Sequence, residues 1–312
     1  MMTFLSPRLS ILSLLVWLTA TAASAQTLTQ PLGAPAQPFG PPSPSVPSLS
    51  QTPPPPLTAK QVSVTASAVF AGSNEPIRTG LVWRVFEDRG DASQPSIVAR
   101  SSSSMPGFTL APGNYIVHVT YGFASASKRI SVQSGNLTER LVVSAGALRL
   151  KGAVGESPIP ASRISFSVYV PEAQNSEGKL IIADAKPNAV IRLPEGTYHV
   201  VSTYGDANAI MRSDLKVEAG KVTEATVNHR AATVTLKLVA SEGGEAFAGT
   251  AFSVLTPGGD VIREAIGAFP SVTLAEGEYV LIARHEGKVY TKDFKVESGL
   301  DRDIEVLVTG NP

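Results

Sequence analysis

Apolar residues recur at every second position along short stretches of the chain after residue 60. Tyr115, Val117, Val119 and Tyr121 make one such series. This spacing fits strands that bury one face and expose the other. Turn residues separate the short stretches, and no window carries a helical period long enough to compete. The pattern therefore predicts an all-β chain of antiparallel β-sandwiches.

One six-residue pattern, Leu-x-x-Gly-x-Tyr, occurs three times in this region. Its fixed residues are Leu110, Gly113 and Tyr115, then Leu193, Gly196 and Tyr198, then Leu274, Gly277 and Tyr279. The tyrosines lie 83 and 81 residues apart. Self-similarity at a nearly constant period is typical of tandem domains.

Other landmarks repeat with the pattern. An aromatic strand precedes each tyrosine and begins at Trp83, Phe166 or Phe252. A further strand follows each tyrosine and ends in a glycine 20, 22 and 20 residues later. We predict three domains of one type at residues 60–145, 146–231 and 232–309.

We predict a structural role for the nine fixed residues. In this interpretation the leucine ends one strand in the core, and the glycine supplies a backbone angle that other residues resist. The tyrosine opens the next strand with its ring inward. Its hydroxyl then bonds a nearby backbone group, as the tyrosine corner does in immunoglobulin-like sandwiches. The alternative is that the tyrosines contact a ligand.

The order of these landmarks resembles bacterial carboxypeptidase-regulatory-like domains. The resemblance covers residues 60–309 three times over, and fibronectin type III and other immunoglobulin-like repeats share the pattern. It implies a seven-stranded prealbumin-like sandwich with an accessory, adhesive or carbohydrate-contacting role. It implies no catalytic residue, because the carboxypeptidase activity belongs to a different domain.

The first 25 residues have the features of a secretory signal peptide. Arg8 precedes a short apolar run, and small residues through Ala25 form a cleavage site. The apolar run is shorter than the roughly 18 to 20 residues that span a bilayer, which disfavours a retained anchor. We predict a periplasmic or cell-surface protein with no transmembrane segment after the signal is removed.

Residues 26–59 predict a disordered, proline-rich linker. They contain no charged residue and 11 of the chain's 24 prolines. Such a segment cannot bury a core and favours extended, semi-rigid conformations. A stalk is the simpler interpretation, and a proline-rich ligand for a partner domain is the alternative.

Composition excludes several classes of function. The chain has no cysteine, so disulfides, thiol catalysis and cysteine-ligated metals are excluded. Removing the signal leaves 25 basic and 26 acidic residues. This balance argues against a nucleic acid as the main partner.

Candidate catalytic chemistry is sparse. The histidines are His118, His199, His229 and His285. They fall at different places relative to the repeat tyrosines, without metal-binding or nucleophile motifs, so we interpret them as surface or rim residues. We predict no enzymatic activity, no metal and no cofactor.

Three functional hypotheses follow. The first is a non-enzymatic exported scaffold or adhesion-type binding protein of the bacterial envelope, with an envelope protein or polysaccharide as partner. The second is a carbohydrate-binding module protein, although Trp83 occupies a predicted core position. The third is a hydrolase with an unfamiliar site. Fold alone does not decide between them.

Overall fold

The structure is a computed structural model that describes residues 61–90, 96–173 and 175–308. The predicted signal peptide and proline-rich linker lie outside the described residues. All 22 regular elements in the described ranges are strands. No helix long and apolar enough to cross a membrane occurs in these ranges.

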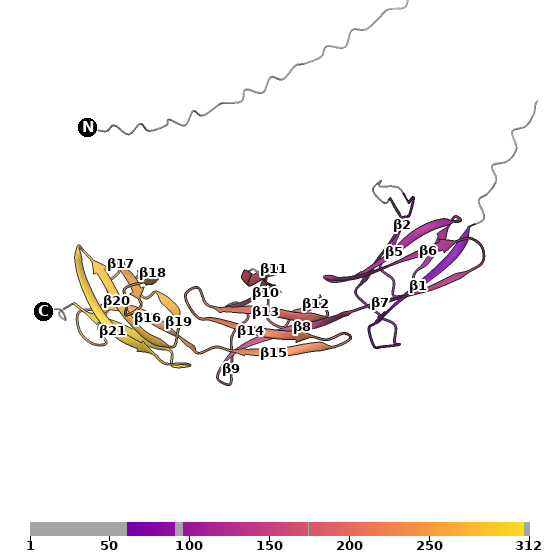
Figure 1. Cartoon of the computed structure of the whole chain (residues 1–312). Coiled ribbons are helices and arrows are strands. Elements are labelled where there is room, and N and C mark those ends of the chain that lie inside the picture. The colour runs from indigo at the N-terminus through magenta and orange to yellow at the C-terminus, as the bar shows by residue number, and fades with distance from the viewer. Residues whose placement is uncertain (1–60, 91–95, 174, 309–312) are drawn as a thin grey trace, which may run out of the picture. The chain divides into compact units, whose positions relative to one another are not determined.

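Sandwich 1 consists of strands β1 to β7 (Figure 1). One sheet has the order β4-β1-β7, with bounds Gly107–Leu110, Val62–Phe70 and Leu137–Val143. The other has the order β3-β2-β5-β6, with bounds Ile97–Ser101, Leu81–Glu87, Gly113–Tyr121 and Ala124–Val132.

Sandwich 2 consists of β8 to β15 and repeats this arrangement. One sheet has the order β12-β8-β15, with bounds Val190–Pro194, Ala145–Val154 and Val222–Asn228, and the short β9, Ser157–Pro158, pairs with β8. The other has the order β11-β10-β13-β14, with bounds Asn175–Ala185, Ile164–Glu172, Gly196–Tyr204 and Ile210–Val217.

Sandwich 3 consists of β16 to β22 in the same topology. One sheet has the order β19-β16-β22, with bounds Ser271–Ala275, Ala231–Val239 and Arg302–Leu307. The other has the order β18-β17-β20-β21, with bounds Val261–Gly267, Thr250–Leu255, Gly277–His285 and Lys288–Val296.

The predicted fold class, tandem antiparallel β-sandwiches, is confirmed, with one addition. The first and last long strands of each sandwich pair in parallel: β1 with β7, β8 with β15, and β16 with β22. All other strand pairs are antiparallel. Residue alternation fixes which face a strand buries but not the direction of its neighbour, so the sequence carried no signal for the parallel pairs.

Each sandwich has its own core between its two sheets. The buried residues form three clusters, spanning residues 62–145, 148–231 and 232–306. Trp83, Phe166 and Phe252 are at most 1% exposed, as expected for core positions. Each pairs with the residue four positions after its repeat tyrosine, so the three cores share one register. The exact domain limits stay a prediction.

Candidate functional site at the sandwich junctions

Each repeat tyrosine closes a turn with its hydroxyl group. We call residues 110–115, 193–198 and 274–279 the tyrosine turns. The hydroxyl donates to the carbonyl oxygen four residues earlier, at 2.9 Å from Tyr115, 2.8 Å from Tyr198 and 2.8 Å from Tyr279. All three rings are buried, and burial raises the pKa of Tyr198. This bond satisfies a carbonyl that would otherwise lack a partner beside the core.

The leucines and glycines of the turns lie at strand ends. Leu110, Leu193 and Leu274 are buried near the ends of β4, β12 and β19. The glycines Gly113, Gly196 and Gly277 open β5, β13 and β20. The three turns lie in three different sandwiches and do not form one common site.

The sequence-based expectation that these glycines supply an unusual backbone angle was wrong at two of the three positions. Gly113 and Gly277 do not have a positive φ, whereas Gly196 has a φ of 159°, which residues with a side chain rarely adopt. A Cβ at Gly113 would instead contact the Tyr115 ring at 3.5 Å. In sandwiches 1 and 3 the glycine therefore lies under the tyrosine ring at the start of a strand, without an unusual backbone angle.

The junction of sandwiches 1 and 2 is built around an arginine and a tyrosine. The guanidinium carbon of Arg192, in β12, lies 5.1 Å from the centre of the Tyr121 ring at the end of β5. The Phe123 amide donates to the Arg192 carbonyl oxygen at 3.0 Å. Next to them, a Cβ at Gly220 would lie 3.4 Å from the Phe70 side chain. Stacking of arginine on an aromatic face is favourable, most of all where water is excluded.

The junction of sandwiches 2 and 3 uses equivalent tyrosine and glycine positions but a different arginine. Arg163 lies 5.2 Å from the centre of the Tyr204 ring, and both residues belong to sandwich 2. Arg163 also donates to the hydroxyls of Thr233 and Thr273 in sandwich 3, at 2.8 and 2.6 Å. Gly299 takes the place of Gly220 and packs against Val154.

The two junctions therefore correspond position by position. Tyr121 and Tyr204 each lie six residues after a turn tyrosine, and Arg192 and Thr273 each directly precede a turn leucine. The arginine crosses from sandwich 2 toward sandwich 1 at the first junction. At the second it remains stacked within sandwich 2 and reaches sandwich 3 through hydrogen bonds.

An open cleft lies at each junction. The first, of about 530 Å³, is lined by Phe70, Tyr121, Gly220 and Lys221 among others. The second, of about 460 Å³, is lined by Arg163, several serine and threonine hydroxyls, and exposed charges such as Lys186 and Asp184. Clefts between domains are common places for binding, and the groups present suit polar or charged surfaces.

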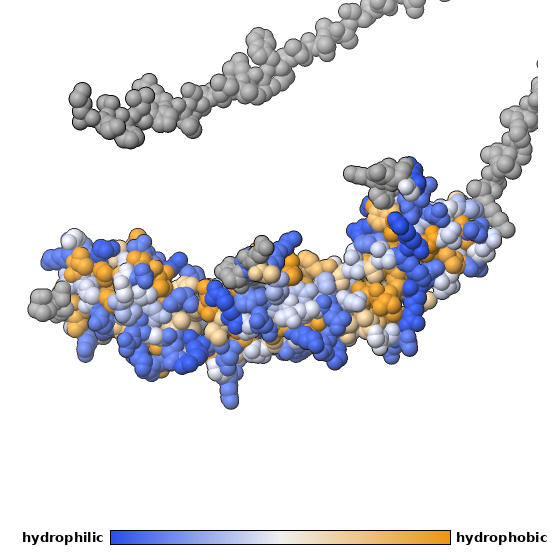
Figure 2. All heavy atoms as spheres, viewed as in Figure 1, coloured by the Kyte–Doolittle hydropathy of each residue, from blue (hydrophilic) through white to orange (hydrophobic). Residues whose placement is uncertain are grey.

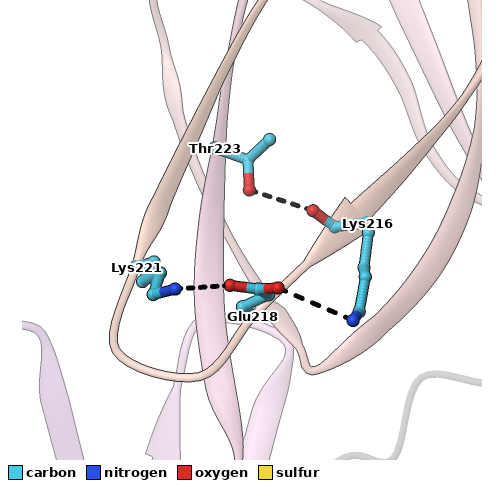
Figure 3. A network of polar contacts seen from close by, with 4 residues as sticks. All are labelled: Lys216, Glu218, Lys221 and Thr223. Atoms are coloured by element: carbon cyan, nitrogen blue, oxygen red, sulfur yellow. Dashed lines mark hydrogen bonds and ion pairs between the residues drawn. The ribbon is translucent and has the colours of Figure 1, made fainter.

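A solvent-exposed polar network borders the first cleft (Figure 3). Lys221 donates to the carboxylate of Glu218 at 2.6 Å, and Lys216 lies 3.6 Å from it. The hydrogen bond and charge of Lys221, aided by Lys216, hold the pKa of Glu218 below its usual range. Thr223 donates to the Lys216 carbonyl oxygen at 2.9 Å and so links β14 to β15, which belong to different sheets of sandwich 2.

One histidine differs from the sequence-based expectation. His118, His199 and His285 are half-buried, but His229 is 1% exposed, so the expectation of a surface or rim residue was wrong there. Its Nε2 lies 2.7 Å from the Oγ of Ser202, which is fully buried. This serine and histidine have the contact of a nucleophile and a base, but no substrate reaches a fully buried hydroxyl.

The described residues contain no group of three or more histidine, aspartate or glutamate side chains placed to hold a metal ion. Figure 2 shows hydrophilic and apolar side chains intermixed on the visible face. Among the described residues, the exposed phenylalanines are Phe123 and Phe269, which belong to different sandwiches and do not form an aromatic row.

Sequence reasoning did not identify the junction residues Arg163 and Arg192, nor the burial of His229. The two arginines give no periodic signal, because they contact residues of a neighbouring domain. The sequence did show one irregularity in the repeat. The turn tyrosine and the glycine after the following strand are 22 residues apart in the middle repeat and 20 in the others.

Comparison with known families gives one match. Residues 233–308 match the model of the Rhizobiales growth-associated tandem repeat domain. The matched range is less than half of the chain and lies within sandwich 3. No curated protein shows significant sequence similarity to the chain.

Several solved structures show a distant likeness. A streptococcal ancillary pilin is 12% identical, with 81% of this chain and all of that chain covered at a TM-score of 0.28. The major pilin subunit BcpA of Bacillus cereus is 11% identical, with 80% and 99% covered at 0.24. The Bacillus anthracis TIE protein is 15% identical at 0.24, and the alignment covers 79% of this chain but only 51% of that chain. These values are low, and the fold described above rests on the strands and cores of this chain alone.

Proposed function

We propose that the chain is a non-enzymatic exported scaffold or adhesion-type binding protein of the bacterial cell envelope, with a role in envelope growth. Repetition is the observation that carries this proposal. Three sandwiches of one topology follow one another, and the third matches a domain family described as growth-associated and tandem. Repeated domains with direct junctions provide defined spacing and several similar surfaces.

The connections between sandwiches support a spacing role. β7 ends at Val143 and β8 begins at Ala145, while β15 ends at Asn228 and β16 begins at Ala231. Connections of one or two residues leave little freedom for a linker. Export is supported by the sequence of residues 1–25, which is typical of a secretory signal.

The partner in this proposal is an envelope protein or a polysaccharide. Three linked sandwiches gain avidity from weak individual contacts, because binding of one raises the effective concentration of the next. The polar clefts at the junctions are the surfaces that this proposal assigns to such contacts.

Cell fractionation and gene deletion test the proposal together. We expect the native chain in the periplasmic or surface fraction, and slowed or misshapen growth in the deletion strain that the intact gene restores. Recovery in the cytoplasm would contradict export, and normal growth of the deletion strain would contradict the growth role. Turnover of a glycan, ester or peptide by the purified mature chain would contradict the non-enzymatic assignment.

A further inference from the structure

The hairpin loop between β13 and β14 is longer than its counterparts. Two residues, Gly122-Phe123, connect β5 to β6, and two residues, Glu286-Gly287, connect β20 to β21. Residues 205–209 make the same connection in sandwich 2. The three extra loop residues, less the one residue by which β14 is shorter than β6 and β21, give the two extra residues between tyrosine and glycine in the middle repeat.

This loop contacts sandwich 3 at three successive residues. Asp206 forms an ion pair with Arg263 at 2.5 Å, and Ala207 packs against the core of sandwich 3. Both side chains of this ion pair are exposed, so it contributes little to the stability of the junction. The half-buried Asn208 makes the contacts that hold the loop against sandwich 3.

Asn208 binds the tyrosine turn of sandwich 3 through both ends of its carboxamide. Its Nδ2 donates to the Tyr279 hydroxyl at 2.9 Å, and its Oδ1 accepts from the Ala275 amide at 3.0 Å. The Tyr279 hydroxyl in turn donates to the Ala275 carbonyl oxygen. The three residues close a ring of hydrogen bonds in which each donor has an acceptor. Only one orientation of the carboxamide satisfies the Ala275 amide.

The first junction has neither half of this contact. The position of Ala275 is Pro194 in the tyrosine turn of sandwich 2, and proline has no amide hydrogen to donate. The two-residue hairpin loop of sandwich 1 offers no carboxamide. The long loop and a tyrosine turn with an amide that can donate to it therefore occur together, at the second junction.

We propose that residues 205–209 form a latch, in which Asn208 binds the tyrosine turn of sandwich 3 and holds sandwiches 2 and 3 as one body in solution. Arg163 lies beside the latch, because its carbonyl oxygen accepts from the Gly205 amide at 2.8 Å, and it supports the latch by donating to Thr233 and Thr273 of sandwich 3. The inference goes beyond the proposed function and can be tested independently of it, because it concerns the geometry of the purified chain.

The absence of cysteine from the sequence makes the test direct, since two introduced cysteines are the only labelling sites. Lys179→Cys in β11 and Lys288→Cys in β21 place spin labels at exposed positions of sandwiches 2 and 3 in the mature chain. We expect a narrow distance distribution by pulsed electron resonance, and a clearly broader one after Asn208→Ala. Asn136→Ala, at an exposed turn of sandwich 1, is the matched control and should leave the distribution narrow.

Hydrogen exchange separates loss of the latch from general destabilisation. In Asn208→Ala the Ala275 amide loses its acceptor and should exchange roughly five- to tenfold faster, the effect of one hydrogen bond. Asn208→Asp keeps an acceptor and should retain more of the Ala275 protection. A distribution that is already broad in the native chain, or one that stays narrow in Asn208→Ala, would overturn the proposal.

Discussion

The Tyr198 hydroxyl donates to the Pro194 carbonyl oxygen across the turn that opens β13. Removing the hydroxyl in Tyr198→Phe leaves that carbonyl without its partner beside a buried ring. We expect sandwich 2 to lose about 1 to 2 kcal/mol of stability. The measurement is hydrogen exchange of the β13 amides, which reports on this sandwich separately from the other two.

Tyr169→Phe is the matched control in the same sandwich. Tyr169 is half-buried in β10, and in the described structure its hydroxyl has no hydrogen bond. We expect little change in exchange for this variant. Equal effects of the two substitutions on exchange would mean that the Tyr198 hydroxyl does not stabilise sandwich 2. Lost partner binding by Tyr198→Phe with unchanged stability would mean that the turn is a binding site rather than a core element.

Gly122 lies where the backbone and its neighbour both exclude a side chain. Its φ is +63°, and a Cβ there would lie 2.5 Å from the Arg192 Cβ and 2.7 Å from the Arg192 carbonyl oxygen. We expect Gly122→Ala to destabilise the chain by more than the 1 to 2 kcal/mol or so that a left-handed backbone alone costs. The added part is the displacement of Arg192 from the Tyr121 ring.

Gly72→Ala isolates the backbone part of this effect. Gly72 has a φ of +76° but nothing within 4 Å of its Cβ position. Urea unfolding of the two variants should therefore differ, with the lower midpoint for Gly122→Ala. Identical midpoints would show that sandwich 2 moves away from Gly122 at no cost.

Substitution of Glu218 tests whether an exposed polar network contributes to the stability of the chain. Glu218→Gln removes the ion pairs with Lys221 and Lys216 drawn in Figure 3. Because all three side chains are well exposed, water and salt replace the lost interactions. We expect an unchanged melting temperature at physiological salt. A clear drop would indicate that the network stabilises the nearby junction and not only the loop between β14 and β15.

The sequence predicted the fold class because the alternation of apolar residues is a local property. It also located the turns, since Leu193 and Tyr198 belong to one short segment. The pairing of β8 with β15 and the contact of Asn208 with Tyr279 connect residues that are distant in the chain, so periodicity could not reveal them. The glycine of the turn was found for the wrong reason, because Tyr115 covers Gly113 and no strained backbone angle is present.

The buried pair of Ser202 and His229 has no polar counterpart in the other sandwiches. Strand register places Val119 and Val143 at these positions in sandwich 1, and Ala283 and Val308 in sandwich 3. Burial lowers the pKa of His229. The Tyr204 ring lies edge-on to the imidazole, and Arg163 stacks on that tyrosine. The neighbouring Arg230 is paired with Glu276. Within the described ranges, no acidic side chain contacts His229 to offset a positive charge on it.

The chain should therefore lose stability in weak acid. An unfolded histidine takes up its proton near pH 6.5, whereas the folded one does so only at lower pH. The contribution of the neutral His229 to the free energy of unfolding is complete above about pH 6.5. It declines as the pH falls from there toward the pKa of the folded histidine. For one proton, the free energy of unfolding changes by at most about 1.4 kcal/mol per pH unit. His118, whose pKa is also lowered by burial and by Arg84, adds a similar dependence in sandwich 1.

The double variant Ser202→Ala with His229→Val separates the two histidines, because it gives sandwich 2 the residues that sandwich 3 already has. Replacing both partners of a buried hydrogen bond by apolar groups is often nearly neutral, so stability at pH 7.5 should change little. Between pH 6.5 and 5, the protection factors of the β13 and β15 amides, which correct for the pH dependence of the intrinsic exchange rate, should fall in the native chain and much less in the variant. If both chains respond equally to pH, the acid sensitivity arises elsewhere and the buried pair is only a packing variant of the valines in the other cores.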